Sequence, residues 1–354
     1  MLLLLAALAQ LATALATLDP RWTVTLDQPP AAAPAFDTEA VYVPLRGGGL
    51  AAVDLARGRV RWQQSVATTI PPATGVGLVF VATDGGVDAL SALTGRSVWQ
   101  TSLPGPLVTI TWDTGWLLCS NAAGDVAALR ASDGTLVWRA SLGAPLVTAP
   151  AAGLDRIYVG LDGGRVVSLG LASGAETWAR TVPGRVTSLQ AVDGQLIVGT
   201  TGNAVFSLDL ASGRQRWRWR IGGDVAGRAT ADDRHIYFTA RDNVVRAVDR
   251  GNGNLRWTAE LPSRPVGGPQ LLDGAVLVPM ATAIASFDPA TGKALGSVPI
   301  RGEMRVAPHL RASARPTGPR MVTLTLDGRL QAFAPRIEAP PALIDGLPGV
   351  VVVP

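Results

Sequence analysis

The chain is built from short apolar runs that alternate with glycine-rich turns. No long stretch keeps an apolar stripe at the 3.6-residue period of a helix. A representative unit holds four such runs, at residues 144–153, 156–162, 164–171 and 175–182. The second and third are joined by Asp162-Gly163-Gly164, a sequence that tolerates positive φ and suits a hairpin turn. The pattern predicts four short antiparallel strands, with 144–153 innermost and 175–182 outermost.

A segment that ends in tryptophan recurs along the chain, as in "AVDLARGRVRW" at residues 52–62 and "AVDRGNGNLRW" at residues 247–257. Seven copies share a glycine at a spacing of 37 to 40 residues, and these are Gly58, Gly95, Gly134, Gly174, Gly213, Gly253 and Gly292. Six copies end in Trp62, Trp99, Trp138, Trp178, Trp217 and Trp257, and the seventh has Gly296 instead. A period near 40 residues built from strands is typical of propeller blades. We expect the tryptophans to be structural, wedged between neighbouring blades.

The two ends of the repeat complement each other. Residues 320–335 supply the second and third strands of one more unit but stop before any tryptophan motif. Residues 18–26 carry Trp22, 40 residues before Trp62, with no strands ahead of it. The N-terminal segment should therefore form the outer strand of the last blade, which removes an open sheet edge. The prediction is an all-β, eight-bladed propeller of four-stranded antiparallel blades over residues 17–335.

One stretch, "RQRWRWRIGG" at residues 214–223, has two interpretations. Alternating arginines and tryptophans could bind phosphates and stack on bases. However, Trp217 occupies the recurring tryptophan position, and strand alternation puts Arg216, Arg218 and Arg220 on the opposite face from it. The formal net charge of +4 over 354 residues is weak support for a nucleic-acid partner. We expect the stretch to be a blade edge and no nucleic acid to be bound.

Residues able to carry chemistry are few. Cys119 is the single cysteine, which excludes an intramolecular disulfide, a cysteine-rich zinc cluster and a haem attachment motif. His235 and His309 lie far apart in the sequence and make a poor metal-ligand set. No nucleophile motif of the G-x-S-x-G type is present. We expect no catalytic residue and no metal site.

The terminal segments differ from the repeats. Residues 1–16 are apolar and end in Ala14-Leu15-Ala16, which is typical of a secretory signal peptide, with a buried N-terminal helix as the alternative. We expect the mature chain to be exported, and periplasmic or secreted. No cysteine directly follows residue 16 to carry a lipid, so we expect no lipid anchor. We also expect a monomer without a transmembrane span. Residues 336–354 form a tail with four consecutive valines, 350–353. This tail could pack on the propeller or add a strand to a partner's sheet.

The recurring segment follows the pattern A-x-D-x-x-T-G-x-x-x-W, which Ala52, Asp54, Gly58 and Trp62 match well. This pattern resembles the docking repeat of the PQQ-type propellers, and the resemblance covers about residues 18 to 335. That family includes the quinoprotein alcohol dehydrogenases and the non-enzymatic scaffold BamB of the outer-membrane β-barrel assembly machinery. A WD-repeat propeller fits less well, since the WD dipeptide is missing from the blade ends.

The resemblance leaves two functions open, because one fold hosts both. The dehydrogenases place a disulfide of adjacent cysteines against the quinone and carry large insertions, and this chain has neither. The favoured hypothesis is a non-enzymatic interaction scaffold with protein partners, possible envelope assembly proteins among them, and no cofactor. The alternative is a redox protein that binds the quinone PQQ in its central channel. Absorbance of the protein with added PQQ and calcium would separate the two.

The entries to the inner strands suggest where a partner binds. At the start of the inner strand, eleven to thirteen residues after each repeat glycine, the third and fourth copies have Leu107 and Leu146. The next four copies have charged residues there, Arg185, Asp224, Arg264 and Arg305. One half of a channel mouth should then be apolar and the other half charged, and arginine forks suit carboxylates. The alternative is that these are ordinary solvated loop charges.

Overall fold

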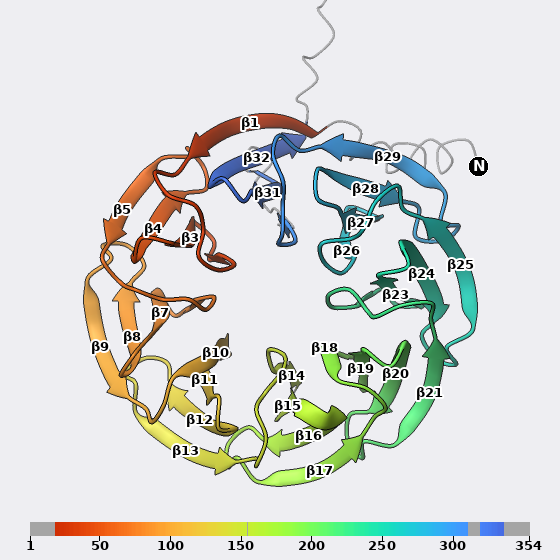
Figure 1. Ribbon diagram of the computed structural model, residues 1–354, viewed down its shortest axis with the longest axis horizontal. Helices are drawn as coiled ribbons and strands as arrows, with labels where there is room; N and C mark the ends of the chain where they lie inside the picture. The colour runs from red at the N-terminus through yellow and green to blue at the C-terminus, as the bar shows by residue number, and fades with distance from the viewer. Residues whose placement is uncertain (1–17, 154, 311–318, 336–354) are drawn as a thin grey trace, which may run out of the picture.

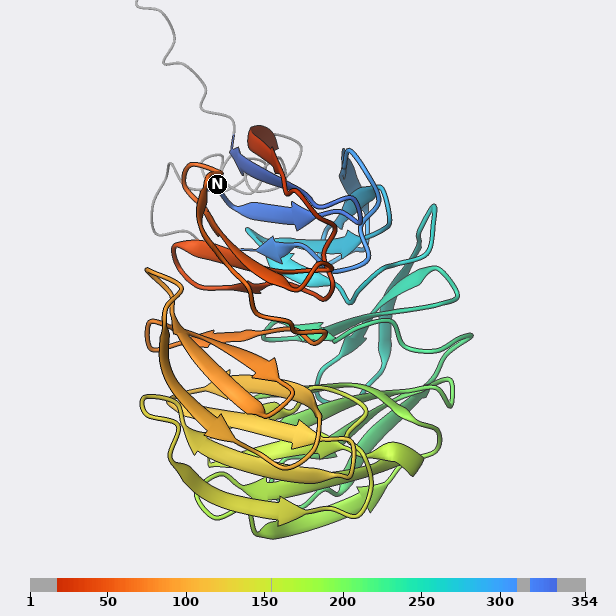
Figure 2. The ribbon, with the colours of Figure 1, turned by 60° about the vertical axis from the view of Figure 1, so that its left-hand side comes forward.

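The computed structural model describes residues 18–153, 155–310 and 319–335. Eight four-stranded antiparallel sheets are arranged as blades around a central axis, which confirms the predicted propeller (Figure 1). Figure 2 shows blades 2 to 5, coloured orange to green, following one another face to face around the ring. The predicted signal peptide, residues 1–16, and the tail, residues 336–354, lie outside the described residues.

The blades follow the chain in order, each from its inner to its outer strand. Blades 1 to 4 consist of β2 (Ala35–Phe36), β3 (Ala40–Leu45), β4 (Gly49–Asp54) and β5 (Val60–Gln64); β6 (Ala73–Gly75), β7 (Leu78–Thr83), β8 (Gly86–Ser91) and β9 (Ser97–Ser102); β10 (Leu107–Asp113), β11 (Trp116–Asn121), β12 (Asp125–Arg130) and β13 (Leu136–Ser141); and β14 (Ala151–Gly153), β15 (Arg156–Gly160), β16 (Arg165–Gly170) and β17 (Glu176–Thr181). Blades 5 to 7 consist of β18 (Val186–Val192), β19 (Gln195–Thr200), β20 (Ala204–Asp209) and β21 (Gln215–Arg220); β22 (Thr230–Ala231), β23 (His235–Ala240), β24 (Val244–Asp249) and β25 (Leu255–Glu260); and β26 (Gln270–Leu272), β27 (Ala275–Pro279), β28 (Ala283–Phe287) and β29 (Ala294–Pro299).

Blade 8 is assembled from both ends of the described chain. It contains β30 (His309–Leu310), β31 (Met321–Leu324) and β32 (Arg329–Pro335), and its outer strand is β1 (Leu18–Thr25). Strand β1 pairs antiparallel with β32, with Val24 opposite Leu330. Figure 1 shows this junction where the red strand lies against the blue one. The N-terminal segment therefore closes the ring, as predicted.

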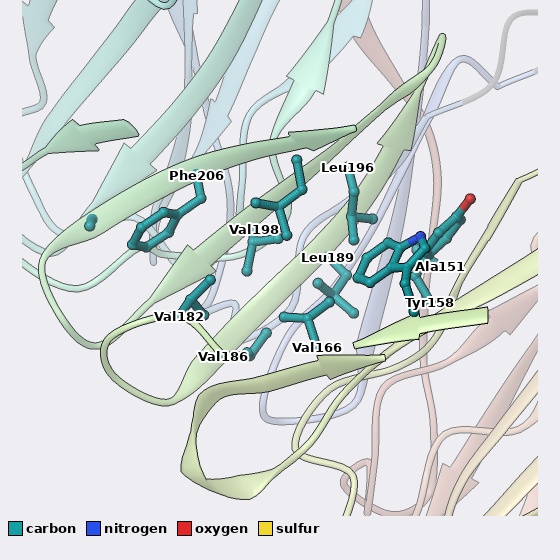
Figure 3. Packing of buried hydrophobic residues seen from close by; sticks show 12 residues of the cluster. Ala151, Tyr158, Val166, Val182, Val186, Leu189, Leu196, Val198 and Phe206 are labelled. Atoms are coloured by element: carbon teal, nitrogen blue, oxygen red, sulfur yellow. The ribbon is translucent and has the colours of Figure 1, made fainter. Parts of the chain in front are cut away.

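The hydrophobic core is divided into clusters that lie between neighbouring sheets. In the cluster between blades 4 and 5, Tyr158 and Val166 of one sheet pack against Leu189, Val198 and Phe206 of the next (Figure 3). All five side chains are buried. Because each blade covers one apolar face of its neighbour, no blade could bury its own apolar residues alone.

Each recurring tryptophan contacts the turn of the following blade. Trp178 of blade 4 lies against Gly213 of blade 5, and its indole N–H donates to the Leu210 carbonyl oxygen at 2.9 Å. Seven such pairs exist, with N–O distances from 2.7 to 3.3 Å. The pairs are Trp22 with Gly58, Trp62 with Gly95, Trp99 with Gly134, Trp138 with Gly174, Trp178 with Gly213, Trp217 with Gly253 and Trp257 with Gly292.

The glycine in this pair meets two requirements at once. Gly213 has a φ of +66°, which favours glycine in the left-handed region. A Cβ placed there would lie 2.6 Å from Trp178 Cε3. A second ring supports the indole from within its own blade, because Tyr158 tilts against Trp178 with ring centroids 5.8 Å apart. The glycine turn and the tryptophan are therefore two halves of one blade-to-blade contact.

The junction between blades 7 and 8 has no such contact. Gly296 of β29 occupies the position of the tryptophan, and a Cβ there would meet no atom within 4 Å. The partner turn is also missing in the described residues of blade 8, because its third and fourth strands come from opposite ends of the sequence. A tryptophan at position 296 would have no described glycine turn to contact. Here the blades are joined by apolar packing and by Arg320, whose Nη2 donates to both carboxylate oxygens of Asp273.

The inner strands are shorter than the sequence pattern predicts. The run 144–153 pairs only at a bridge from Leu146 to Leu161 and then over β14. Proline lacks the N–H that a ladder needs, and a proline directly precedes the paired inner segment in five blades. These prolines are Pro34, Pro72, Pro150, Pro269 and Pro308. Blades 3 and 5 have Ile110 and Leu189 instead and form seven-residue inner strands, β10 and β18. Blade 6 has Ala229 at this position, and its inner strand β22 is short without a proline.

Replacement of Trp178 by alanine should lower the free energy of unfolding by about 3–5 kcal/mol, because it removes a buried indole and leaves a cavity. Gly213→Ala should be destabilising for a second reason, since its Cβ would clash with the indole. Gly163→Ala is the matched control, because Gly163 also has positive φ but open space around it. Chemical denaturation measures all three, and equal losses for the two glycine variants would contradict the contact described here.

Deletion of residues 18–27 should expose the edge of β32 and cause aggregation, because strand β1 is the only cover for that edge among the described residues. Trp22→Ala keeps the strand and should destabilise without aggregation. Size-exclusion chromatography with thermal melting tests both. A deletion variant that stays monomeric with an unchanged melting temperature would refute this role of β1.

Candidate functional site at one mouth of the channel

A set of equivalent residues marks one mouth of the channel. In five blades, the carbonyl oxygen of the residue at the inner-strand entry accepts a hydrogen bond from a residue one or two positions after the second strand. The acceptors are Pro29, Pro145, Arg185, Asp224 and Glu303, and the corresponding donors are Arg46, Asp162, Thr201, Arg241 and Leu326. We call these acceptor positions, together with the positions that strand pairing makes equivalent in other blades, the mouth ring.

The mouth ring corrects the sequence-based alignment by one residue. Leu107 and Leu146 pair with the second strand exactly as Val186 does, so they are equivalent to Val186 and not to Arg185. Leu146 is buried in the core and Leu107 packs partly into it, so neither forms an apolar half of the mouth. Strand alternation explains the error, because a shift of one residue moves a side chain to the other face.

The four charged candidates are therefore not all equivalent. Arg264 precedes the bridged Pro265 as Asp224 precedes the bridged Val225, so both belong to the mouth ring. Arg305 follows the bridged Met304, and it lines a separate hollow of about 210 Å³ beside Arg46. Its place in the ring is taken by Glu303. From blade 5 to blade 8 the ring consequently alternates in sign, as Arg185, Asp224, Arg264 and Glu303.

Arg185 and Asp224 line one hollow of about 400 Å³, which we call the mouth hollow. Arg241, which sequence reasoning missed, lies beside them, because its backbone N–H donates to the Asp224 carbonyl oxygen at 2.9 Å. The signal for Arg241 was its place directly after the second strand, β23. The rest of the lining consists of Val147, Val186, Val225, Ala226, Gly227, Pro265 and Val266, with Thr187 and Thr201. The side chains of Val186 and Val225 are buried in the core, so Val147 and Val266 supply most of the apolar side-chain contact.

The charged side chains of the mouth hollow are weakly engaged. Arg185 is exposed, and its Nε lies 3.8 Å from an Asp162 carboxylate oxygen. Within the described ranges, the side chains of Asp224, Arg241 and Arg264 make no hydrogen bond or ion pair. The mouth hollow thus offers one cation and one carboxylate without close partners, Arg241 and Asp224, and a weakly paired second cation, Arg185. Val147 and Val266 add partly exposed apolar side chains. This combination suits a polar polypeptide segment with an apolar contact at its centre.

The arginine–tryptophan stretch forms strand β21 at the rim of blade 5. Trp217 is buried against blade 6, which leaves no free indole face at that position for stacking. Arg216 donates to Asp209 at 2.6 Å, and this hydrogen bond, with another from Ser212, lowers the pKa of Asp209 to about 2. Arg218 lies over the Phe206 ring at 5.3 Å. Arg216 and Arg218 therefore contact residues of their own blade, and Trp217 packs against the next blade.

The remaining reactive side chains are also engaged in packing. Tyr237 donates to Asp232 at 2.6 Å beside His235, and Tyr42 donates in the same way to Asp37 in blade 1, where no histidine is present. The arrangement is thus a feature of the repeat. His309 stacks on Phe36 with ring centroids 4.0 Å apart, and burial raises the pKa of the Cys119 thiol. Across the described parts of the chain, no group of three or more metal-ligating residues comes together.

The described residues include no helix that is long and apolar enough to cross a membrane.

A sequence profile of the family described as outer membrane protein assembly factor BamB matches residues 9–71, 68–193 and 162–332. No curated protein matches the sequence.

Three solved structures share the fold at low sequence identity. BamB from Moraxella catarrhalis is 17% identical, with a TM-score of 0.73 over 90% of this chain and 99% of that one. The computationally designed Ika8 protein is 15% identical, with a TM-score of 0.76 over 88% and 97%. Sqt1 from Saccharomyces cerevisiae is 9% identical, with a TM-score of 0.77 over 91% and 100%. At these identities the structural likeness concerns the fold alone.

Within the mouth hollow, Thr187→Val should raise the free energy of unfolding by about 1 kcal/mol, because the Thr187 hydroxyl is buried without a hydrogen-bond partner. Thr200→Val is the matched control and should cost about 1–2 kcal/mol. The Thr200 hydroxyl donates to the Ala204 carbonyl oxygen at 3.1 Å and accepts from the Gly202 N–H at 3.2 Å. Urea denaturation compares the two, and a destabilised Thr187→Val variant would contradict the assignment.

Proposed function

The chain belongs to the family of the outer membrane protein assembly factor BamB, and from this premise we propose that it is a non-enzymatic, exported scaffold that binds a protein of the cell envelope. The process that this family implies is outer-membrane protein assembly. The mature chain would act as a monomer after removal of residues 1–16, which lie outside the described part of the structure.

The mouth hollow is the observation that carries this proposal. It combines the partly exposed apolar side chains of Val147 and Val266 with three charged residues. Asp224 and Arg241 have no close side-chain partner in the described residues, and Arg185 has only the ion pair of 3.8 Å with Asp162. Interfaces between proteins commonly place such charges around an apolar centre, where they orient the partner and exclude wrong ones. A segment with alternating charges and a small apolar side chain would match both features.

The even spacing of the repeats and their lack of reactive residues support a scaffold over an enzyme. From Gly58 to Gly292 the copies keep a spacing of 37 to 40 residues, so these repeats carry no large insertion that could build an active site above the blades. The adjacent cysteine pair of the quinoprotein dehydrogenases cannot form with a single cysteine, and Cys119 is buried in the core. His235 and His309 are engaged by Asp232 and Phe36, respectively.

A photo-crosslinking amino acid at position 264, on the mouth ring, should capture one discrete envelope protein in living cells. The same group at position 218 on the outer strand is the control and should not capture it, because β21 lies at the rim of the blade. Charge reversal by Arg185→Glu with Arg241→Glu should lower the yield at position 264 about tenfold or more.

Both arginines of that double variant lie at the mouth without strong ion pairs, so the melting temperature should stay nearly unchanged. Equal capture from positions 218 and 264, or an unaltered yield in the folded double variant, would refute the mouth hollow as the binding surface.

A further inference from the structure

A single arginine interrupts a pattern of small residues near the channel axis. In each blade, one inner-strand residue pairs with the middle of the second strand, as Thr230 pairs with Tyr237 in blade 6. The residue two positions before it is equivalent in all eight blades. These positions are Ala33, Pro71, Thr109, Ala149, Ser188, Arg228, Gly268 and Ala307. Only blade 6 carries a long, charged side chain there.

The backbone around Arg228 is fixed by a close approach between blades 6 and 7. Gly227 has a φ of +72°, and a Cβ at this residue would lie 2.0 Å from the Gly268 nitrogen. The contact is reciprocal, because a Cβ on Gly268 would collide with the Arg228 carbonyl oxygen. Two glycines thus let the segments touch, and Arg228 is held at a defined place.

Arg228 lines a hollow of about 520 Å³ formed by the inner segments of blades 5 to 8, which we call the lumen hollow. Among the described residues, the lining of this hollow has one permanent cation, Arg228, and no carboxylate. Its polar groups are Gln190, Thr230, Gln270 and His309, which occupy one equivalent position in successive blades. Blades 1, 2 and 4 have Ala35, Ala73 and Ala151 at this position and blade 3 has Thr111, so the polar side chains are concentrated in blades 5 to 8.

Two groups in the lumen hollow lack the partners that their chemistry requires. The Arg228 side chain is open to the channel and makes no hydrogen bond or ion pair with the described residues. The surrounding blades nevertheless restrict its hydration, and this desolvation lowers the pKa of its guanidinium. The Gln270 side-chain oxygen is buried and accepts no hydrogen bond. A bound carboxylate could pair with Arg228 directly, and a rotation of the Gln270 side-chain amide would bring its oxygen to the hollow to accept from the same molecule.

We propose that the lumen hollow binds a small organic carboxylate that also carries a hydrogen-bond donor. The guanidinium of Arg228 pairs with the carboxylate through parallel N–H donors, and Gln270 Oε1 accepts from the ligand's hydroxyl or amine. Leu271 and Leu310 line the same hollow and contact the ligand's carbon atoms. One arginine matches one carboxylate, so a molecule with several carboxylates would bring unpaired negative charge into the hollow.

This site is distinct from the protein-binding surface, because the mouth hollow and the lumen hollow share only Gly227 among their lining residues. It also does not depend on the proposed function.

The test is an NMR titration of the full-length protein with 3-hydroxybutyrate, followed through the backbone amides of Gly227, Thr230 and Gln270. We expect saturable shifts at these amides. Butyrate, which lacks the donor, should bind about threefold or more weakly, and neutral 3-hydroxybutyramide should produce no saturable shift. Inorganic sulfate should bind more weakly than 3-hydroxybutyrate.

Variants of Arg228 and Gln270 test the pairing with the carboxylate and the hydrogen bond to the ligand's donor separately. Arg228→Gln should weaken 3-hydroxybutyrate about tenfold or more, and Arg218→Gln, on the outer strand, should leave it unchanged. Gln270→Leu should abolish the preference over butyrate. The proposal is overturned by unsaturable shifts in the wild-type protein, by equal binding of sulfate, or by unchanged affinity in folded Arg228→Gln. The wild-type ligand series decides the question even if a variant fails to fold.

Discussion

The ring depends on the contact between a tryptophan and a left-handed glycine turn in the next blade. Each sheet leaves an apolar face that only its neighbour can cover, so the position of one blade on the next fixes the whole structure. The indole supplies buried area, its N–H donates to a carbonyl in the adjacent turn, and the glycine allows contact at van der Waals distance. Seven repetitions of this contact and one strand from the N-terminal end close the propeller.

This regularity accounts for what could be predicted from the sequence. The spacing of the glycines and tryptophans indicated the blade number, and Trp22 indicated that the first strand joins the last blade. The missing tryptophan at Gly296 was visible in the sequence, but its reason was not. The structure shows that the described residues of blade 8 offer no turn for it, since β32 and β1 are not consecutive in the chain.

The site was harder to predict because it depends on register. Leu107, Leu146 and Arg305 were placed one or two residues away from their structural equivalents, and on a strand that difference changes which side chains share a face. Prolines also interrupt the inner strands, so apolar periodicity alone could not align them. The place of Arg241 directly after the second strand was visible in the sequence, but the backbone hydrogen bond that brings it beside Asp224 joins two loops and was not. The repeat is thus regular at the outer strands and varies from blade to blade near the axis, where the mouth hollow lies on blades 4 to 7 and the lumen hollow on blades 5 to 8.

Native-state hydrogen exchange tests the role of the tryptophan contact most directly, because it reports the opening free energy of each blade. If these contacts hold the ring, amides in β27, β28, β31 and β32, beside the junction without a tryptophan, should exchange through the lowest-energy opening. Amides in β15, β16, β19 and β20, between Trp138, Trp178 and Trp217, should exchange only through global unfolding. Equal or greater protection of blades 7 and 8 would contradict this account.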